Sequence, residues 1–283
     1  MSDLVWLNGE YLPRERATVS VDDRGFLFGD GVYEVIRVVG GRYIDADRHL
    51  RRLRRSLAEL ELVDPAASGL DLLGIGAELV GRQRLGNGEA AIYLQVTRGA
   101  APRRHAFPPA GTPPTVFIAA AAFEPKASQR AHGVAAITHP DLRWDRCDIK
   151  SVNLLPNVLA NQRATERGAC EAILVRGRTV TEATHSSVFA VIDGCVRTHP
   201  NGPAILPGVT RGVVLELAAA EGLALREDAF EADDLPRATE LFLTGTTTDV
   251  MPVTHLDGRP VGMGVPGPVA RRLGELLQER MER

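Results

Sequence analysis

The apolar segments of this 283-residue chain are short, and their length limits the folds open to it. Residues 32–39 and 115–122 are rich in β-branched and small apolar side chains and have the length of buried strands. Between such runs lie helical periodicities, the clearest in residues 49–62, where leucines recur every three or four positions. No run approaches the ~20 apolar residues that a membrane-spanning helix requires. The pattern therefore predicts an α+β fold.

The middle of the chain contains the expected domain boundary. The length sets an expectation of about two domains, and a proline-rich loop, residues 98–114, precedes the last strand of the first half. We predict an N-terminal α+β domain over residues 1–122, a linker over residues 123–128 and a C-terminal α+β domain over residues 129–283. In the second domain we expect a helix over residues 152–167 and another that is N-capped by Thr210.

Charge and cysteine content limit the partners and the compartment. The net charge of −3 attracts neither nucleic acid nor an anionic membrane, so a small-molecule partner is expected. The start of the chain lacks a basic segment followed by an apolar run, which indicates no signal peptide. Cys147, Cys170 and Cys195 are odd in number and widely spaced, which predicts neither a metal site nor a disulfide framework and fits a reducing cytoplasm.

Lysine is unusually rare in this chain. Of the 33 basic residues only two are lysines, Lys126 and Lys150, and the rest are arginines. An arginine guanidinium is too basic to act as a nucleophile, so a lysine is the residue to expect where a primary amine is required. Lys126 follows Glu-Pro in the expected linker, where a solvated cation is ordinary. A chemical role for Lys150 is a hypothesis at this point, and an ordinary surface role remains open.

Two segments have features of anion sites, although the standard phosphate and hydrolase signatures are absent. In residues 206–211 a glycine turn leads into a helix whose first amides lack partners. Residues 244–248 combine a glycine with several threonine hydroxyls. Glu182, near a turn between strands, is a candidate partner for a cationic ring nitrogen. All three features have ordinary alternatives: residues 206–211 as a helix cap, residues 244–248 as a turn, and Glu182 as a solvated carboxylate.

Five segments follow one another along the chain: RGFLFGDGVYEVIRV, CDIKSVNLLPNVLANQ, TVTEATHSSVF, ILPGVTR and LFLTGTTTDVMPV. In order and spacing they resemble the class IV (fold-type IV) pyridoxal-phosphate-dependent aminotransferases. That family includes D-amino acid and branched-chain aminotransferases, (R)-selective amine transaminases and aminodeoxychorismate lyase. The resemblance extends from about Leu7 to the C-terminal helix and implies the two-domain fold of that family, a homodimer and pyridoxal 5'-phosphate as cofactor.

The resemblance implies a role for each matching position. Lys150 matches the catalytic lysine that forms a Schiff base with the cofactor and moves the substrate proton. Glu182 matches the carboxylate that keeps the pyridine nitrogen protonated. The other implied cofactor contacts are Arg52, Val209, Thr210 and Thr246 at the phosphate, Leu206 beneath the ring and Arg143 near the phenolic oxygen.

The substrate class is implied by a different segment. The loop over residues 97–108 resembles that of D-amino acid aminotransferases, in which an Arg-x-His pair binds the substrate carboxylate. This role falls on Arg103 and His105, with Tyr33 completing the carboxylate site; an arginine fork suits a planar carboxylate. The resemblance implies transamination of D-alanine and similar D-amino acids with a 2-oxo acid such as 2-oxoglutarate. Aminodeoxychorismate lyase and transamination of (R)-amines or branched-chain amino acids remain alternatives.

Two positions depart from the family pattern. After Glu182 the family often has Gly-Ser-Ser, whereas this chain has Ala-Thr-His and so places His185 in the turn. Gly245 stands where a serine is common, which removes a hydroxyl. Both changes affect affinity or specificity and leave the identity of the cofactor unchanged.

Overall fold

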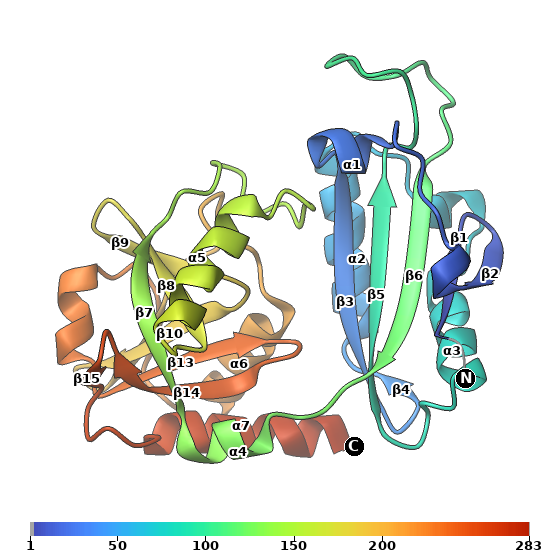
Figure 1. Ribbon diagram of the computed structural model, residues 1–283. Coiled ribbons are helices and arrows are strands. Elements are labelled where there is room, and N and C mark those ends of the chain that lie inside the picture. Colours follow the sequence, from blue (N-terminus) through green and yellow to red (C-terminus); the bar gives the residue numbers. More distant parts are fainter. Residues whose placement is uncertain (1–2, 283) are drawn as a thin grey trace. The chain divides into compact units, whose positions relative to one another are not determined.

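The computed structural model describes residues 3–282 and divides into two compact units (Figure 1). Unit 1 comprises residues 1–125 and 149–153, and unit 2 comprises residues 126–148 and 154–283. The first boundary falls inside the predicted linker, residues 123–128. Ile149–Asn153, which lie within the predicted C-terminal domain of residues 129–283, cluster with unit 1.

Backbone hydrogen bonds and core packing explain why this segment belongs to unit 1. The amide of Tyr33 donates to the carbonyl of Lys150, and that of Val152 donates to the carbonyl of Gly31, both at 3.0 Å. Ile149 is buried in the same apolar core as the strands of unit 1. The segment therefore lies along β3 (Gly31–Val39), to which it is joined by an isolated bridge between Val32 and Ser151.

Unit 1 contains an antiparallel sheet in the order β2-β1-β6-β5-β3-β4 within the described residues. Helices α2 and α3 cover one face of this sheet (Figure 1). Its elements are β1 (Leu4–Leu7), β2 (Glu10–Pro13), η1 (Arg14–Arg16), α1 (Arg24–Phe28), β3 (Gly31–Val39), β4 (Arg42–Tyr43), α2 (Ala46–Glu59), η2 (Pro65–Ser68), α3 (Leu72–Arg82), β5 (Glu89–Thr97) and β6 (Thr115–Ala122).

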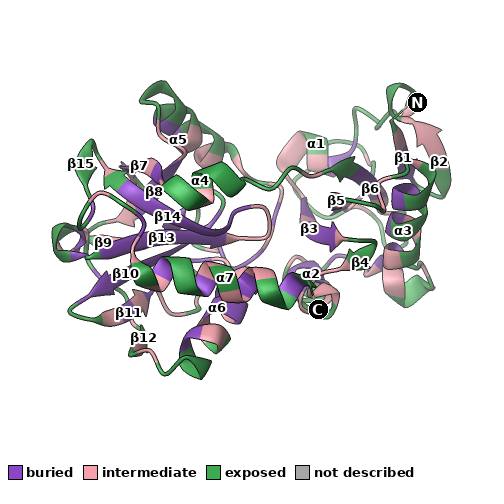
Figure 2. Cartoon of the chain, turned by 90° about the horizontal axis from the view of Figure 1, so that it is seen from below, coloured by how far each residue is buried: buried purple, intermediate pink, exposed green. Residues whose placement is uncertain are grey.

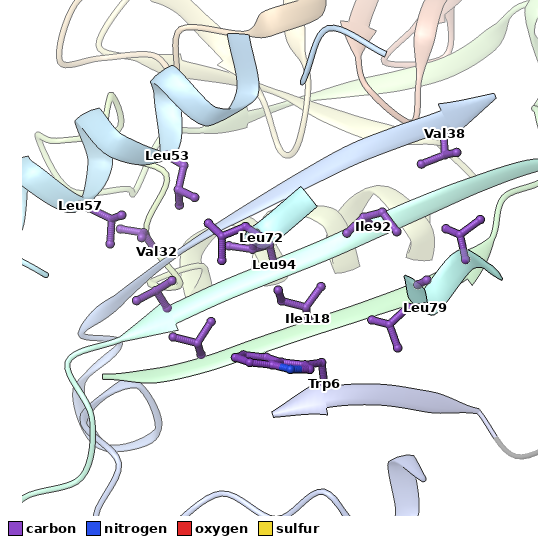
Figure 3. Packing of buried hydrophobic residues seen from close by; sticks show 14 of the residues in the cluster. Trp6, Val32, Val38, Leu53, Leu57, Leu72, Leu79, Ile92, Leu94 and Ile118 are labelled. Atoms are coloured by element: carbon purple, nitrogen blue, oxygen red, sulfur yellow. The ribbon is translucent and has the colours of Figure 1, made fainter. Parts of the chain in front are cut away.

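Alternation along the strands builds the core of unit 1. Side chains at every second position of the central strands face the helices, as expected for strands with one covered face. Figure 3 shows Ile92, Leu94 and Ile118 from the strands facing Leu53 and Leu57 from α2. The sheet is thereby fixed against α2, the helix that carries Arg52.

Unit 2 contains a mixed sheet in the order β12-β11-β10-β13-β14-β7-β8-β9, with β15 paired to β14, within the described residues. Figure 2 shows β13 and β14 buried, and α6 and α7 pack on these strands. Its elements are α4 (Ala127–His132), β7 (Val134–Pro140), α5 (Leu155–Glu166), β8 (Glu171–Arg176), β9 (Thr179–Ala183), β10 (Ser187–Ile192), β11 (Cys195–Thr198), α6 (Val209–Ala220), β12 (Leu225–Glu227), η3 (Ala232–Arg237), β13 (Glu240–Gly245), β14 (Asp249–Leu256), β15 (Arg259–Pro260) and α7 (Pro268–Glu282).

Most predicted elements are present, and the differences have local causes. The strand over residues 115–122 and the helix beginning near residue 152 are found, the latter starting at Leu155. The expectation that Thr210 is the N-cap of α6 is wrong: Gly208 occupies the N-cap, and Thr210 is the second helical residue. Among residues 3–282 we find no helix with the length and apolarity needed to cross a membrane.

Candidate active site

Lys150 lies in unit 1, and its amine has no carboxylate partner among the described residues there. Its Nζ lies 4.1 Å from the centroid of the Tyr33 ring, a cation–π distance. Its backbone is fixed because the amide donates to Ser56 Oγ at 3.1 Å and the carbonyl accepts from Tyr33. Within residues 3–282 the Nζ atom makes no hydrogen bond or ion pair. The backbone at Lys150 is therefore fixed, and its amine lies over the Tyr33 ring.

A fully buried carboxylate, Glu34, organises the opposite face of β3. Arg52 donates from Nε and Nη2 to its two oxygens at 2.7 and 2.8 Å, and His49 Nδ1 lies 2.9 Å from Oε2. Burial alone would raise the pKa of Glu34, but the charge and hydrogen bonds of Arg52, with His49 and Lys150, lower it to about 2. Burial lowers the pKa of His49 below its usual value. Glu34 is thus ionised at neutral pH and the His49 ring neutral.

Arg52, the predicted phosphate ligand, is held by its pair with Glu34. Arg52 is buried, and its bidentate pair with Glu34 fixes the plane of the guanidinium. Its contact with a phosphate remains a prediction. Glu34 and His49 were not predicted from the sequence, although two features pointed to them. Glu34 is an acid inside a β-branched run, and a buried acid must be paired. His49 and Arg52 are three residues apart and therefore share one helix face.

Glu182 is buried near the end of β9 in unit 2, and its oxygens are held by donors. Both oxygens accept from the Leu206 amide at 3.2 Å, and Arg143 Nη1 contacts Oε1. Burial raises the pKa of Glu182, whereas the Arg143 charge and the Leu206 amide favour the ionised form. Arg143 also pairs with Asp141 at 2.8 Å, so it is itself fixed. Its predicted place near a phenolic oxygen is untested.

The start of α6 has the structure of an anion site. Gly208 is its N-cap, and no side chain caps the helix. The amides of Val209 and Thr210, in the first turn of the helix, lack intrahelical partners and favour an anion. A Cβ atom on Gly208 would lie 2.7 Å from Ser187 Oγ, so a larger residue here requires the Ser187 side chain to move. Leu206, the predicted apolar residue beneath the ring, is half-buried beside this turn.

The second predicted phosphate segment lies next to the first within unit 2. A Cβ atom on Gly245 would lie 3.7 Å from Ser186 Cβ, and the preceding residue of β13 pairs with Ser187. The consecutive residues Ser186 and Ser187 therefore connect the turn that carries Thr246 with the start of α6. Ser187 is buried and makes no side-chain hydrogen bond within the described part of the chain. Its hydroxyl was not predicted as part of the site.

The histidine that departs from the family pattern is anchored to a buried acid. His185 Nδ1 lies 3.3 Å from Oε1 of Glu171, and its amide donates to the same oxygen at 2.6 Å. Ser186 Oγ donates to the other oxygen at 2.8 Å. Glu171 is fully buried, so this turn has a fixed geometry, while the His185 ring stays exposed.

The predicted carboxylate-binding residues fall into two places in unit 1. Tyr33 lies beside Lys150 and stacks on Tyr93, with ring centroids 5.7 Å apart. Arg103 and His105 are exposed on the long loop between β5 and β6, and both contact the Phe28 ring. Within residues 3–282 we find no contact between Tyr33 and either loop residue. Their joint action on one carboxylate stays a prediction.

The donors in the two units fit the chemistry of a phosphorylated pyridine aldehyde. Unit 1 supplies a primary amine without a carboxylate partner, and unit 2 supplies a buried carboxylate together with a helix start that no side chain caps. In the part of the chain that the structure describes, no group of three or more His, Cys, Asp or Glu side chains has metal-binding geometry.

Comparison with known proteins yields one family. The family model described as Amino-transferase class IV matches residues 31–256. A D-alanine aminotransferase of Bacillus licheniformis is 43% identical over 274 residues, covering 97% of this chain and 95% of the relative. One from Staphylococcus haemolyticus is 40% identical over 278 residues, covering 98% of each chain.

Solved structures give the same result at lower identity. The Escherichia coli branched-chain amino acid aminotransferase superposes with a TM-score of 0.85 at 26% identity, covering 99% of this chain and 94% of that chain. A fold IV transaminase from Curtobacterium pusillum gives a TM-score of 0.82 at 27% identity, covering 97% of this chain and 93% of that chain.

Proposed function

This chain belongs to the class IV aminotransferases, and from that premise we propose that it is a pyridoxal-phosphate-dependent D-amino acid aminotransferase. It transfers the amino group of D-alanine and related D-amino acids to a 2-oxo acid such as 2-oxoglutarate. The observation that carries the proposal is the Lys150 amine, which is fixed over the Tyr33 ring without a carboxylate partner. The preference for D-amino acids is supported by relatives named D-alanine aminotransferases at 40–43% identity.

Lys150 supplies both the attachment and the base. When bound, pyridoxal phosphate withdraws electrons from the substrate Cα. The fixed backbone of Lys150 limits the positions that Nζ reaches, which favours transfer of a proton between defined atoms. In the described residues no acid forms a salt bridge with Nζ. The amine serves as nucleophile and then as proton carrier.

The remaining residues hold the two ends of the cofactor. Glu182, whose oxygens contact Arg143 and the Leu206 amide, is the carboxylate that would accept a hydrogen bond from the pyridine nitrogen of the cofactor. The α6 amides and the hydroxyls of Thr210 and Thr246 would bind the phosphate. Arg52 would add a positive charge, and its pair with Glu34 fixes the orientation of the guanidinium.

Substrate recognition and assembly complete the proposal. Arg103 and His105 bind the substrate carboxylate together with Tyr33, because a guanidinium fork matches its two oxygens. The family resemblance supports a homodimer, and three free cysteines are consistent with a reducing cytoplasm.

A substrate panel tests this function. With 2-oxoglutarate as acceptor, we expect pyruvate from D-alanine and little or none from L-alanine, and Lys150→Ala abolishes turnover. Faster turnover of L-leucine would support the branched-chain alternative, to which the matched Escherichia coli structure points. Turnover confined to an (R)-amine, or release of 4-aminobenzoate from aminodeoxychorismate, would replace the proposal with the corresponding activity.

A further inference from the structure

Arg24 is a buried arginine that the proposed chemistry does not use. Its side chain is only 5% exposed, although it begins a short helix at the end of the sheet. We infer that Arg24 is a positioning residue that shapes the loop between β5 and β6 so that Arg103 and His105 meet the substrate carboxylate. The inference rests on the proposed function of those two residues.

The guanidinium of Arg24 binds consecutive carbonyls of that loop. Its Nη1 donates to the carbonyl of Arg104 at 2.6 Å and to that of Ala106 at 3.3 Å, and Nη2 lies 3.5 Å from the carbonyl of His105. The backbone on both sides of His105 is therefore fastened to one rigid, planar group. A lysine in this place has its three donors on a single nitrogen and lacks the planar fork of the guanidinium.

Asp30 binds both Arg24, which holds the middle of the loop, and Arg98, the first residue of the loop. Asp30 accepts from Arg24 Nε at 2.8 Å and, with both oxygens, from Arg98 at 2.8 and 3.0 Å. Hydrogen bonds and charge from Arg98 and Arg24 outweigh burial and lower the pKa of Asp30. Arg98 also donates to the carbonyl of Leu60 at 2.6 Å and packs over Phe107. The start and the tip of the loop thus share one ionic anchor.

The two proposed carboxylate ligands rest on the ring next to this anchor. Phe28, four residues after Arg24 on α1, has the guanidinium carbon of Arg24 4.8 Å from its centroid and that of Arg103 5.3 Å away. The His105 ring lies 5.7 Å from the same centroid. Figure 1 shows α1 at the end of the sheet from which the loop extends. The α1 segment is therefore the support on which the ligand pair lies.

That support is itself fixed to the sheet. Asp23, buried before Arg24, caps α1 and accepts hydroxyl donors from Thr97 at 2.9 Å and Thr115 at 2.6 Å. These threonines are the last residue of β5 and the first of β6, so they flank the loop. Loss of the Arg24 fork would leave the loop joined at its base but unfastened at its tip.

The test compares Arg24→Met and Arg24→Lys with Arg37→Met in the cofactor-loaded enzyme. Arg37 is equally buried, but it pairs with Glu89 at 2.6 Å and packs on Phe123 near the other end of β3. For both Arg24 variants we expect the KM for D-alanine to rise about tenfold, as for loss of charge-assisted hydrogen bonds, with little change in kcat or cofactor binding. The Arg37 variant is expected to lower Tm without changing KM.

Limited trypsin digestion provides a readout that is independent of substrate. The exposed bonds after Arg103 and Arg104 should be cut several-fold faster in the Arg24 variants and at the wild-type rate in Arg37→Met. If Arg24→Met does not fold, Arg24→Lys and Asp30→Asn carry the test. Unchanged cleavage, or faster cleavage with unchanged KM, overturns the inference. A wild-type enzyme that does not use D-alanine refutes the proposed function instead, while the cleavage result still decides whether Arg24 holds the loop.

Discussion

Replacement of Glu34 by glutamine should destabilise unit 1 by a magnitude that the structure supplies. The pKa of this carboxyl falls from 4.5 to about 2 because Arg52 and His49 hold its ionised form. At about 1.36 kcal/mol per pKa unit, the ionised form contributes about 3.4 kcal/mol at pH 7. Glutamine has the shape of the protonated acid and lacks the charge, so Glu34→Gln loses roughly that amount, within the range of about 3–5 kcal/mol for breaking a buried pair.

The sign of the pH dependence makes this prediction specific. A lowered folded-state pKa stabilises the protein above the unfolded-state pKa, and this stabilisation is lost as the pH falls from about 4.5 towards 2. The difference between wild type and Glu34→Gln should therefore narrow from about 3.4 kcal/mol at pH 7 to about 1.4 kcal/mol at pH 3.

Urea denaturation of the cofactor-free protein measures this difference. Trp6 is buried in the core of unit 1, so its fluorescence reports that unit once the exposed Trp144 is replaced by phenylalanine in every variant. Glu78→Gln, which removes an exposed partner of Arg82, is the matched control and should cost less than about 1 kcal/mol. A loss at pH 7 below about 1 kcal/mol, or an equal loss at pH 3, refutes the reasoning.

Two further substitutions test unit 2. Gly208→Ala places a Cβ atom 2.7 Å from Ser187 Oγ at the start of α6, and we expect about tenfold weaker binding of pyridoxal phosphate to the apoprotein by equilibrium dialysis, because the anion site is distorted. Glu182→Gln keeps the size of the side chain but removes the charge opposite the ring nitrogen, so kcat for D-alanine should fall about 100-fold while the cofactor stays bound. Retention of wild-type cofactor affinity or of wild-type kcat, respectively, would contradict these assignments.

Local patterns in the sequence predicted much of the fold and part of the site. The strand over residues 115–122 was predictable because its composition and length determine its state locally. The helix α3 was not predicted because its glycines lower helix propensity. Packing requires a glycine at one of these positions, since a Cβ atom on Gly76 would lie 2.5 Å from Tyr43 Oη. The tertiary contact requires the residue that local propensity disfavours.

Features that depend on contacts between residues far apart in the chain could not be predicted from the sequence. The hydrogen bond that joins the Tyr33 amide to the Lys150 carbonyl spans more than one hundred residues, and no local signal places Ile149–Asn153 in unit 1. Glu34 appeared only as an acid in a strand, since its partners come from α2. The Arg24 fork likewise depends on a loop about eighty residues further along the chain.

The identity of the attachment lysine is the most direct test of the central claim, and this chain offers a simple experiment because it contains only two lysines. The protein loaded with pyridoxal phosphate is reduced with borohydride, digested and mapped by mass spectrometry. We predict a phosphopyridoxyl group on Lys150, unchanged labelling in Lys126→Ala and none in Lys150→Ala. Labelling of Lys126 instead, or of no lysine in protein that binds the cofactor, would contradict the account.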